Sequence, residues 1–109
     1  MDVGFALVVR FTLRDAAAAE GFDELVSRTL EGIRQYEAGT VVYVNHRVPD
    51  EPGVRVFYEL YESRAAFDAH ERQPHVRRFL EQRDKYVTAV EVTFLDGIGG
   101  KVAAGAAFA

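Results

Sequence analysis

The sequence predicts one small α+β domain whose strands and helices follow in the order β-α-β-β-α-β. Three observations lead to this prediction. Four segments have the period of two, or the β-branched and aromatic residues, that are typical of strands. Two helical segments between them carry apolar residues at spacings of three and four. The chain has 109 residues, which suits a single domain.

The first strand and the first helix have clear patterns. Along the first strand, expected over residues 3–11, the alternating apolar residues are Val3, Phe5, Leu7, Val9 and Phe11. Asp15 can cap the helix that follows, and the alanine-rich run after it favours a helix. One face of this helix is apolar and comprises Phe22, Leu25, Val26, Thr29, Leu30 and Ile33. Gly39 is a suitable residue to end it.

A hairpin is expected next in the chain. Residues 40–47 form a second strand, in which Val42 and Val44 share one face. The run 49–53 contains prolines and a glycine and predicts a turn. Residues 54–61 form the third strand, and the short connection favours antiparallel pairing with the second.

The second half of the chain should hold one broken helix and one strand. Ser63 can cap the helix, and Pro74 should break or kink it. Residues 88–95 form the last strand. The expected domain therefore covers residues 1–96, and the small, alanine-rich residues 97–109 are expected to form a flexible C-terminal tail.

This order of elements is that of the ferredoxin-like fold, with an antiparallel sheet. The helices can cover only one face of such a sheet, yet several strands are apolar on both faces. In the first strand, Phe5 and Leu7 oppose Ala6 and Val8. A monomer would expose an apolar sheet face to water, so the sequence predicts a homodimer in which two sheets pack together.

Composition argues against several classes of function. The net charge is −4, whereas nucleic-acid binders normally carry a basic surface, so no nucleic-acid partner is expected. The chain has no cysteine, which excludes disulfides, thiolate metal sites and a cysteine nucleophile. The first residues have no basic region, and the apolar run behind them is too short for a signal peptide or a membrane span. We therefore expect a cytoplasmic protein with no membrane partner.

His70 and His75 are the first candidates for chemistry. They are five residues apart with Pro74 between them, so they do not share an ideal helix face. A metal site would need further ligands, and no metal is expected. His70 is either a core residue hydrogen-bonded to backbone, or a general base or hydrogen-bond donor in a pocket between sheet and helices.

Polar residues on the expected second and third strands are further candidates. Glu59 needs a partner if it is buried, and a structural ion pair with Arg10 or Arg55 is favoured over a catalytic role. Asn45 is either an edge residue or a donor that orients a ligand. Tyrosines such as Tyr43 belong to the core or an interface, or line a pocket for a flat aromatic ligand.

Several runs of the sequence resemble those of a known family. These runs are Glu37-Ala38-Gly39-Thr40, Tyr58-Glu59-Leu60-Tyr61-Glu62-Ser63, Ala66-Phe67-Asp68-Ala69-His70 and Gln73-Pro74-His75-Val76-Arg77-Arg78-Phe79. The order of a glutamate, an aromatic residue and two histidines is similar to that of the antibiotic biosynthesis monooxygenase domain. This domain belongs to the dimeric α+β barrel superfamily, and the resemblance covers about residues 5–95.

The resemblance implies an oxygenase. Members oxidise anthrones, quinols or aromatic polyketides with molecular oxygen, without flavin, metal or nicotinamide, so no cofactor is expected. On matching positions, His70 is the implied base or donor, and Tyr61 stands where many members have a tryptophan. With these two as catalytic residues, Tyr43, Asn45, His75 and Glu59 would contact a small aromatic substrate.

Two departures from related patterns narrow this expectation. Haem-degrading relatives combine an asparagine on the first strand with the tryptophan, and this chain has neither, so haem degradation is not expected. The main hypothesis is a cofactor-independent monooxygenase. The alternative hypothesis is a small-molecule-binding or regulatory homodimer of the same fold that catalyses nothing.

Overall fold

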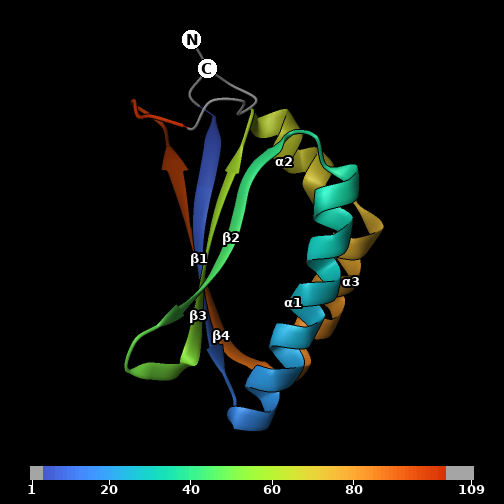
Figure 1. The fold of residues 1–109 in the computed structure, drawn as a ribbon, viewed down its shortest axis with the longest axis vertical. Coiled ribbons are helices and arrows are strands. Elements are labelled where there is room, and N and C mark those ends of the chain that lie inside the picture. Colours follow the sequence, from blue (N-terminus) through green and yellow to red (C-terminus); the bar gives the residue numbers. More distant parts are fainter. Residues whose placement is uncertain (1–3, 103–109) are drawn as a thin grey trace.

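A computed structural model describes residues 4–102 of the chain and confirms the predicted order of elements (Figure 1). The elements are β1 (Phe5–Leu13), α1 (Ala16–Tyr36), β2 (Thr40–Val48), β3 (Glu51–Tyr61), α2 (Arg64–Glu71), α3 (Pro74–Gln82), a short 3₁₀ turn η1 (Arg83–Lys85) and β4 (Val87–Asp96). The fold is ferredoxin-like α+β, as the sequence predicted.

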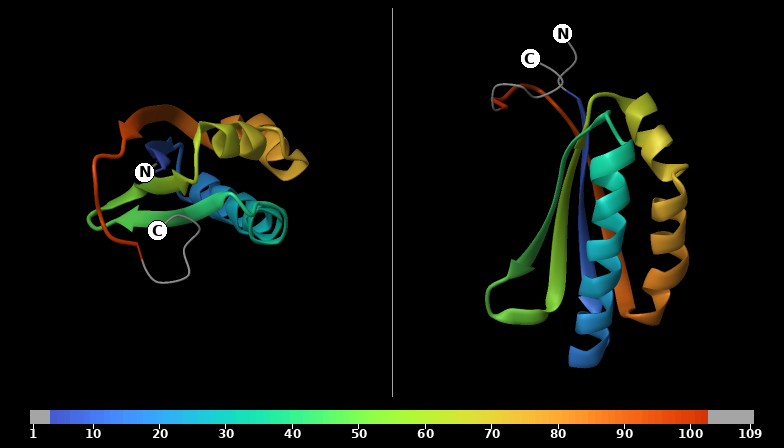
Figure 2. Two further views of the ribbon diagram at one scale, coloured as in Figure 1. Left: turned by 90° about the horizontal axis from the view of Figure 1, so that it is seen from above. Right: turned by 45° about the vertical axis from the view of Figure 1, so that its right-hand side comes forward.

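The four strands form one antiparallel sheet in the order β2-β3-β1-β4. All helices lie on the same side of this sheet, so the molecule has two layers (Figures 1 and 2). The sheet therefore has an inner face toward the helices and an outer face that no described element covers. Because β2 and β4 are the edge strands, β3 and β1 form the centre of both faces.

The core lies between the inner face and the helices. Aromatic side chains from four elements meet there: Phe11 of β1, Phe22 of α1, Phe57 of β3 and Phe79 of α3. Their ring centroids lie between 4.6 and 6.3 Å apart, which is the usual range for packed aromatic pairs. This cluster joins both helical segments to the two central strands.

The predicted helix starts are confirmed. Asp15 Oδ1 accepts a hydrogen bond from the backbone N–H of Ala18 at 2.7 Å, and Ser63 Oγ accepts one from Ala66 at 3.1 Å. Both bonds satisfy a donor that the first helical turn leaves without a partner. Pro74 separates α2 from α3 and occupies the first turn of α3, where a missing N–H costs nothing.

Some strand limits differ from those expected. The hairpin turn is only Pro49–Asp50, and β3 begins at Glu51 rather than at residue 54. Asp50 has a φ of 69°, a left-handed conformation that lets two residues reverse the chain. The first strand runs on to Leu13 because its pairing with β4 continues past Phe11 through a register shift. Val3 and residues 103–109 of the expected tail lie outside the described residues, and residues 97–102 have no regular structure.

Besides its apolar packing in the core, helix α1 makes an ion pair with β3 and two close contacts with aromatic rings. The guanidinium of Arg55 on β3 binds both carboxylate oxygens of Asp23, at 2.9 and 3.0 Å. Two glycines of α1 each receive an aromatic ring. A Cβ atom at Gly21 would lie 2.5 Å from the ring of Tyr86, and one at Gly32 would lie 2.4 Å from the ring of His75. Alanine would not fit at either place without moving the ring.

Candidate functional site

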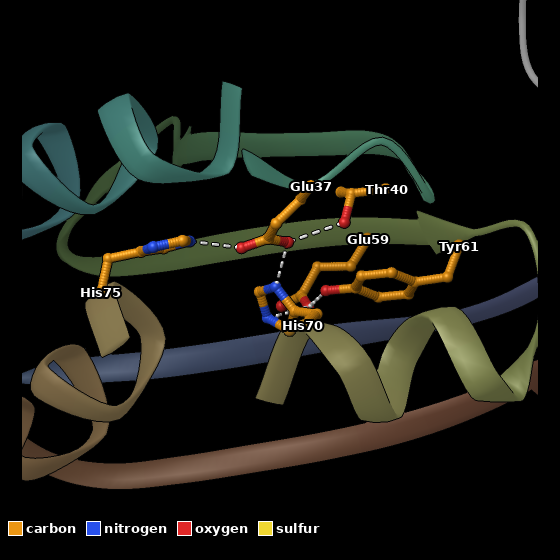
Figure 3. Close-up of polar contacts among 6 residues, drawn as sticks. All are labelled: Glu37, Thr40, Glu59, Tyr61, His70 and His75. Atoms are coloured by element: carbon orange, nitrogen blue, oxygen red, sulfur yellow. Dashed lines mark hydrogen bonds and ion pairs between the residues drawn. The ribbon is translucent and has the colours of Figure 1, made fainter. Parts of the chain in front are cut away.

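Glu37 is the centre of a hydrogen-bonded cluster of side chains at the end of α1 (Figure 3). It is the C-cap residue of α1, and its side chain is only 3% exposed. Its Oε1 accepts hydrogen bonds from Thr40 Oγ1 at 2.7 Å and from His70 Nδ1 at 2.6 Å. Its Oε2 accepts one from His75 Nε2 at 2.5 Å. One carboxylate therefore links α1, β2, α2 and α3.

The direction of these bonds fixes where the two imidazoles carry hydrogen. An ionised carboxylate only accepts hydrogen bonds, so each nitrogen that faces Glu37 must be an N–H. His70 is therefore protonated at Nδ1 and His75 at Nε2. In the neutral imidazole of His70, Nε2 then keeps its lone pair and can accept a proton. This nitrogen faces Glu59 Oε1 at 3.9 Å.

Glu59 and Tyr61 continue the cluster along the inner face of β3. The Tyr61 hydroxyl donates to Glu59 Oε1 at 2.6 Å. The Tyr61 ring is fully buried, and its centroid lies 5.0 Å from that of His70. His70 is thus held between two carboxylates, in close contact with Glu37 and at a longer distance from Glu59.

Burial and charge act differently on the two carboxylates. Burial alone would raise the pKa of Glu37, but the hydrogen bond and charge of His70, with the bonds from Thr40 and His75, lower that pKa below its ordinary value. For Glu59, burial raises the pKa, and the hydrogen bond from Tyr61 and the charge of His70 offset only part of this effect. Glu37 is therefore the stable anion of the cluster, and Glu59 takes up a proton more readily.

The two tyrosines of the site, Tyr61 and Tyr43, both have raised pKa values. Burial raises the pKa of Tyr61, and the charge of Glu59 and the hydrogen bond to it raise the pKa further. Burial also raises the pKa of Tyr43 well above its ordinary value, with the charges of Glu59 and Glu37 adding to the effect and that of Arg83 opposing it. Near neutral pH both hydroxyls are donors, and neither is a base.

His75 reaches Glu37 because α1 has no side chain at Gly32. The His75 ring lies against the α1 backbone there, with Cγ and Nδ1 each 2.4 Å from the place where a Cβ atom would be. The exposed ring of Tyr36 stacks on the other part of this imidazole, with centroids 6.4 Å apart. The Nε2 atom of His75 binds Glu37, and its Nδ1 edge lies against α1 at Gly32.

Tyr43 and Asn45 lie next to one another on the inner face of β2, but only Tyr43 touches the cluster. Its ring centroid is 5.6 Å from that of His70 and 5.8 Å from that of Phe57. Asn45 lies one step further along the face. It lines a cleft of about 230 Å³ between α1 and the strands β2 and β3. Within residues 4–102, Asn45 Nδ2 is buried without a hydrogen-bond partner, and so is Arg83 Nε.

The structure thus brings five of the six candidate residues together, namely His70, Tyr61, Glu59, His75 and Tyr43, and leaves Asn45 apart. The expected partners of Glu59 were wrong. Arg10 lies on the outer face, where it pairs with Glu51 and Glu91, and Arg55 binds Asp23. His70 is buried between the sheet and the helices, with only 5% of its surface exposed.

Glu37 and Thr40 are the residues that sequence reasoning missed as parts of the site. Glu37 lies 33 residues before His70 and 38 before His75, so no local pattern joins them. The available signal was the run 37–40, which contributed to the family resemblance without a role being given to either residue. Over residues 4–102 no group of three or more His, Cys, Asp or Glu side chains is arranged to hold a metal ion.

Comparison with known protein families identifies the family of this chain. The sequence profile of the antibiotic biosynthesis monooxygenase (ABM) family matches residues 4–82, which is more than half of the chain. The protein belongs to the ABM family. The match covers β1 to the end of α3 and so includes Glu37, Glu59, Tyr61 and both histidines of the cluster.

Solved structures share the ABM fold of this chain. A protein from Mycobacterium tuberculosis is 28% identical with a TM-score of 0.81, and the match covers 90% of this chain and 98% of that one. A protein from Pseudomonas aeruginosa is 20% identical with a TM-score of 0.81, covering 91% and 98%. A structure named antibiotic biosynthesis monooxygenase is 22% identical with a TM-score of 0.78, covering 87% and 99%.

Among curated protein sequences, none matches the chain. Among the helices of residues 4–102, none has the length and apolar character needed to cross a membrane.

Proposed function

We propose that this ABM protein is a cofactor-independent monooxygenase that oxidises a small electron-rich aromatic compound, such as a quinol or an anthrone, with molecular oxygen. The observation that carries the proposal is the arrangement around His70. A buried carboxylate binds Nδ1–H of His70, which leaves Nε2 as a proton acceptor on the side of Tyr61 and Glu59. A carboxylate that orients an imidazole in this way is a common device of general-base catalysis.

The reaction needs a base more than it needs a cofactor. When the base removes a proton from an anthrone CH₂ group, the resulting anion can pass one electron to O₂. The substrate radical and superoxide then combine, which forms a C–O bond and gives a hydroperoxide after protonation. Loss of water breaks the O–O bond and leaves a C=O group. The balance is CH₂ + O₂ → C=O + H₂O, and the base is returned to its starting state.

In this proposal the residues divide into a base, its support and its surroundings. His70 takes the proton at Nε2, and Glu37 holds the ring and stabilises the imidazolium. Tyr61 donates to Glu59 and fixes that carboxyl beside Nε2. Tyr43, whose ring contacts His70, would form part of the surroundings of the substrate. His75 holds Glu37 from the other side.

The test is oxygen consumption by metal-stripped protein with a panel of anthrones and hydroquinones. We expect uptake well above buffer autoxidation, and a loss of about 10²-fold or more in His70→Ala, which is the usual size of a general-base effect. His46→Ala is the matched control, because His46 is exposed on β2 and takes no part in the cluster. Uptake no faster than buffer across the panel would refute the oxygenase.

A second candidate function is favoured by the burial of the cluster. His70 is 5% exposed and Tyr61 is fully buried, and both are already hydrogen-bonded within the protein. Such a closed network is also what a purely structural role requires. The protein would then be a small-molecule-binding homodimer without catalysis, and saturable binding with no oxygen uptake would support it.

The homodimer is part of both proposals and is supported by the outer face of the sheet. The strand register places apolar side chains from all four strands there, among them Val44, Tyr58, Val8 and Leu95. Val44 is 42% and Leu95 36% exposed in the single chain. Burying these side chains against a second copy would remove the apolar surface from water.

Sedimentation at micromolar concentration tests the dimer. We expect twice the chain mass for the wild type and the mass of one chain for Tyr58→Glu, because a charge at the centre of the face would have to be buried without a partner. Arg28→Glu, on the exposed side of α1, is the control and should leave the dimer intact. A wild-type monomer would refute the proposal. The cytoplasmic location expected from the sequence stays a prediction.

A further inference from the structure

Tyr61 differs from the other tyrosines of the chain in the partner of its hydroxyl. All five tyrosines lie within residues 4–102, and within this range only Tyr61 donates a hydrogen bond to a carboxylate, Oε1 of Glu59 at 2.6 Å (Figure 3). This length is typical of a strong O–H···O⁻ bond to a charged acceptor. The phenolic proton of Tyr61 is therefore already directed at a group that can take it.

The composition makes tyrosine the side chain from which an electron is most easily removed. The chain has no cysteine and no tryptophan, and its one methionine is the first residue. A phenol loses an electron readily only if its proton leaves at the same time, because the oxidised phenol is a strong acid. A tyrosine hydrogen-bonded to a base is consequently easier to oxidise than one without a base.

The pKa values of the two groups suit a proton transfer that takes place only on oxidation. Burial raises the pKa of Tyr61, as do the charge of Glu59 and the hydrogen bond to it, so the proton stays on the resting phenol. Burial also raises the pKa of Glu59, which makes this carboxylate a better proton acceptor than an exposed one. Once Tyr61 has lost an electron, the proton has only the length of one hydrogen bond to cross.

The surroundings of Tyr61 would protect a radical. The residue is fully buried, and its ring packs against those of Phe67 and His70, with centroids 5.3 and 5.0 Å away. Burial keeps the ring from coupling with a tyrosine of another molecule and from reacting with solutes. Its contact with His70 also places Tyr61 next to the imidazole that the proposed function assigns as the base.

We propose that Tyr61 and Glu59 form a proton-coupled redox pair, in which a one-electron oxidant in the site takes an electron from Tyr61 while the phenolic proton moves to Glu59. The products are a neutral tyrosyl radical and a protonated glutamic acid, so no net charge is created on the pair beyond the electron that leaves. This capacity belongs to the two side chains and does not depend on turnover.

The role of the pair in turnover rests on the proposed function. If superoxide escapes, the substrate radical R• adds O₂ and forms a peroxyl radical, ROO•. This radical takes the electron of Tyr61, Glu59 takes the proton, and the resulting ROO⁻ receives a proton from the imidazolium of His70 to give the hydroperoxide. Superoxide then returns an electron to Tyr61 and Glu59 returns the proton, which releases O₂ and resets the pair.

Photo-oxidation of the full chain tests the pair in the absence of substrate. A ruthenium tris-bipyridyl sensitiser with persulfate supplies the oxidant, and EPR and transient absorbance detect the tyrosyl radical. We expect a radical that lives several-fold longer than that of N-acetyltyrosinamide, that remains in Tyr36→Phe and Tyr43→Phe and that is lost in Tyr61→Phe. A wild type without such a long-lived signal, or a signal that persists in Tyr61→Phe, would overturn the proposal.

Glu59→Gln tests the proton acceptor while keeping the hydrogen bond. The amide oxygen still accepts from Tyr61 but cannot take its proton, so the long-lived radical should form about tenfold more slowly or slower still, as expected when a proton transfer loses its base. Glu81→Gln, on the exposed side of α3, is the matched control and should form it at the wild-type rate. Circular dichroism checks that each variant is folded. Equal rates in Glu59→Gln and the wild type would overturn the role of Glu59.

Oxygen uptake by the same proteins distinguishes this inference from the proposed function. We expect Tyr61→Phe to complete several-fold fewer turnovers than the wild type before it is inactivated, because peroxyl radicals then react with the protein. Radical formation without any oxygen uptake would refute the oxygenase and leave the redox pair standing. Uptake with the same number of turnovers in Tyr61→Phe and the wild type would refute the role in turnover and leave the oxygenase standing.

Discussion

Two neighbouring regions of the inner sheet face differ in whether their buried polar atoms have hydrogen-bond partners. Around Glu37, both carboxylate oxygens are bonded, and His70 and His75 each donate to them. Around Asn45, less than the length of a strand away, a buried amide nitrogen has no partner in the described structure. Tyr43 separates the two regions, since it lies between them on β2.

The difference shows that hydrogen bonding contributes to rigidity and stability in one region and not in the other. A buried network in which every group is satisfied is rigid and holds an imidazole in one orientation, as the positioning of a base requires. An unpaired buried donor instead costs stability and fixes no neighbouring side chain. Loss of a bond to Glu37 should therefore destabilise the protein, whereas loss of the Asn45 amide should not.

The largest expected effect comes from removing the charge of Glu37. Glu37→Gln should lower the free energy of unfolding by about 3 kcal/mol, because an amide presents an N–H to one of two imidazole donors and leaves it buried without an acceptor. Glu59→Gln is the matched control and should cost less than about 1 kcal/mol, since the amide oxygen still accepts from Tyr61. Urea unfolding at pH 7, followed by circular dichroism, measures both, and equal losses would contradict the distinction.

The contributions of Glu37 and Glu59 to stability should also depend on pH in opposite directions. The folded-state pKa of Glu37 is lowered, so its stabilisation is fully present above its ordinary value of 4.5 and is lost as the pH falls through the lower folded value. The pKa of Glu59 is raised, so its contribution has the opposite sign and stability falls as the pH rises above 4.5. Glu37 faces His70, His75 and Thr40, whereas Glu59 faces His70 and Tyr61.

Unfolding curves measured from pH 3 to 7 check these signs. Glu37→Gln should lose less stability than the wild type on acidification below pH 4.5, and Glu59→Gln should lose less on going upward from that pH. The sign for Glu37 would be wrong if Glu37→Gln and the wild type lost stability in parallel below 4.5.

The smallest expected effect concerns the contact between Gly32 and His75. Gly32→Ala should destabilise the wild type by about 1 kcal/mol, because the added methyl group displaces the His75 ring from Glu37. In a His75→Ala background the same change should stabilise the protein by about 0.5–1 kcal/mol, which is the ordinary gain of alanine over glycine in a helix. A double-mutant cycle gives the coupling, and additive effects would show that the contact has no energetic role.

Local patterns predicted most of the fold. The alternation of β1, the caps Asp15 and Ser63 and the break at Pro74 depend on neighbours in sequence, and all are confirmed. The turn was assigned too many residues because the prolines on either side of Asp50 gave a stronger signal than its left-handed conformation, which sequence alone does not display.

The site could be predicted only in part. The histidines and Glu59 were candidates from the residues themselves, and Tyr61 from the family resemblance. The convergence of His70 and His75 on Glu37, however, depends on how α1 packs against α2 and α3. The Glu59 partners were wrong for a simpler reason. Arg10 belongs to the set of β1 residues that alternates with Leu7 and Val9, so it points to the outer face, and that alternation was already visible in the sequence.

The rings that lie on Gly21 and Gly32 have a consequence for motion. The two glycines are 11 residues apart, which at about 100° per residue places them on nearly the same side of α1, three turns from one another. His75 at the start of α3 and Tyr86 after η1 therefore contact the same side of α1 at two places three turns apart. Sliding one helix along the other by a turn of about 5.4 Å would require both rings to leave their places at once.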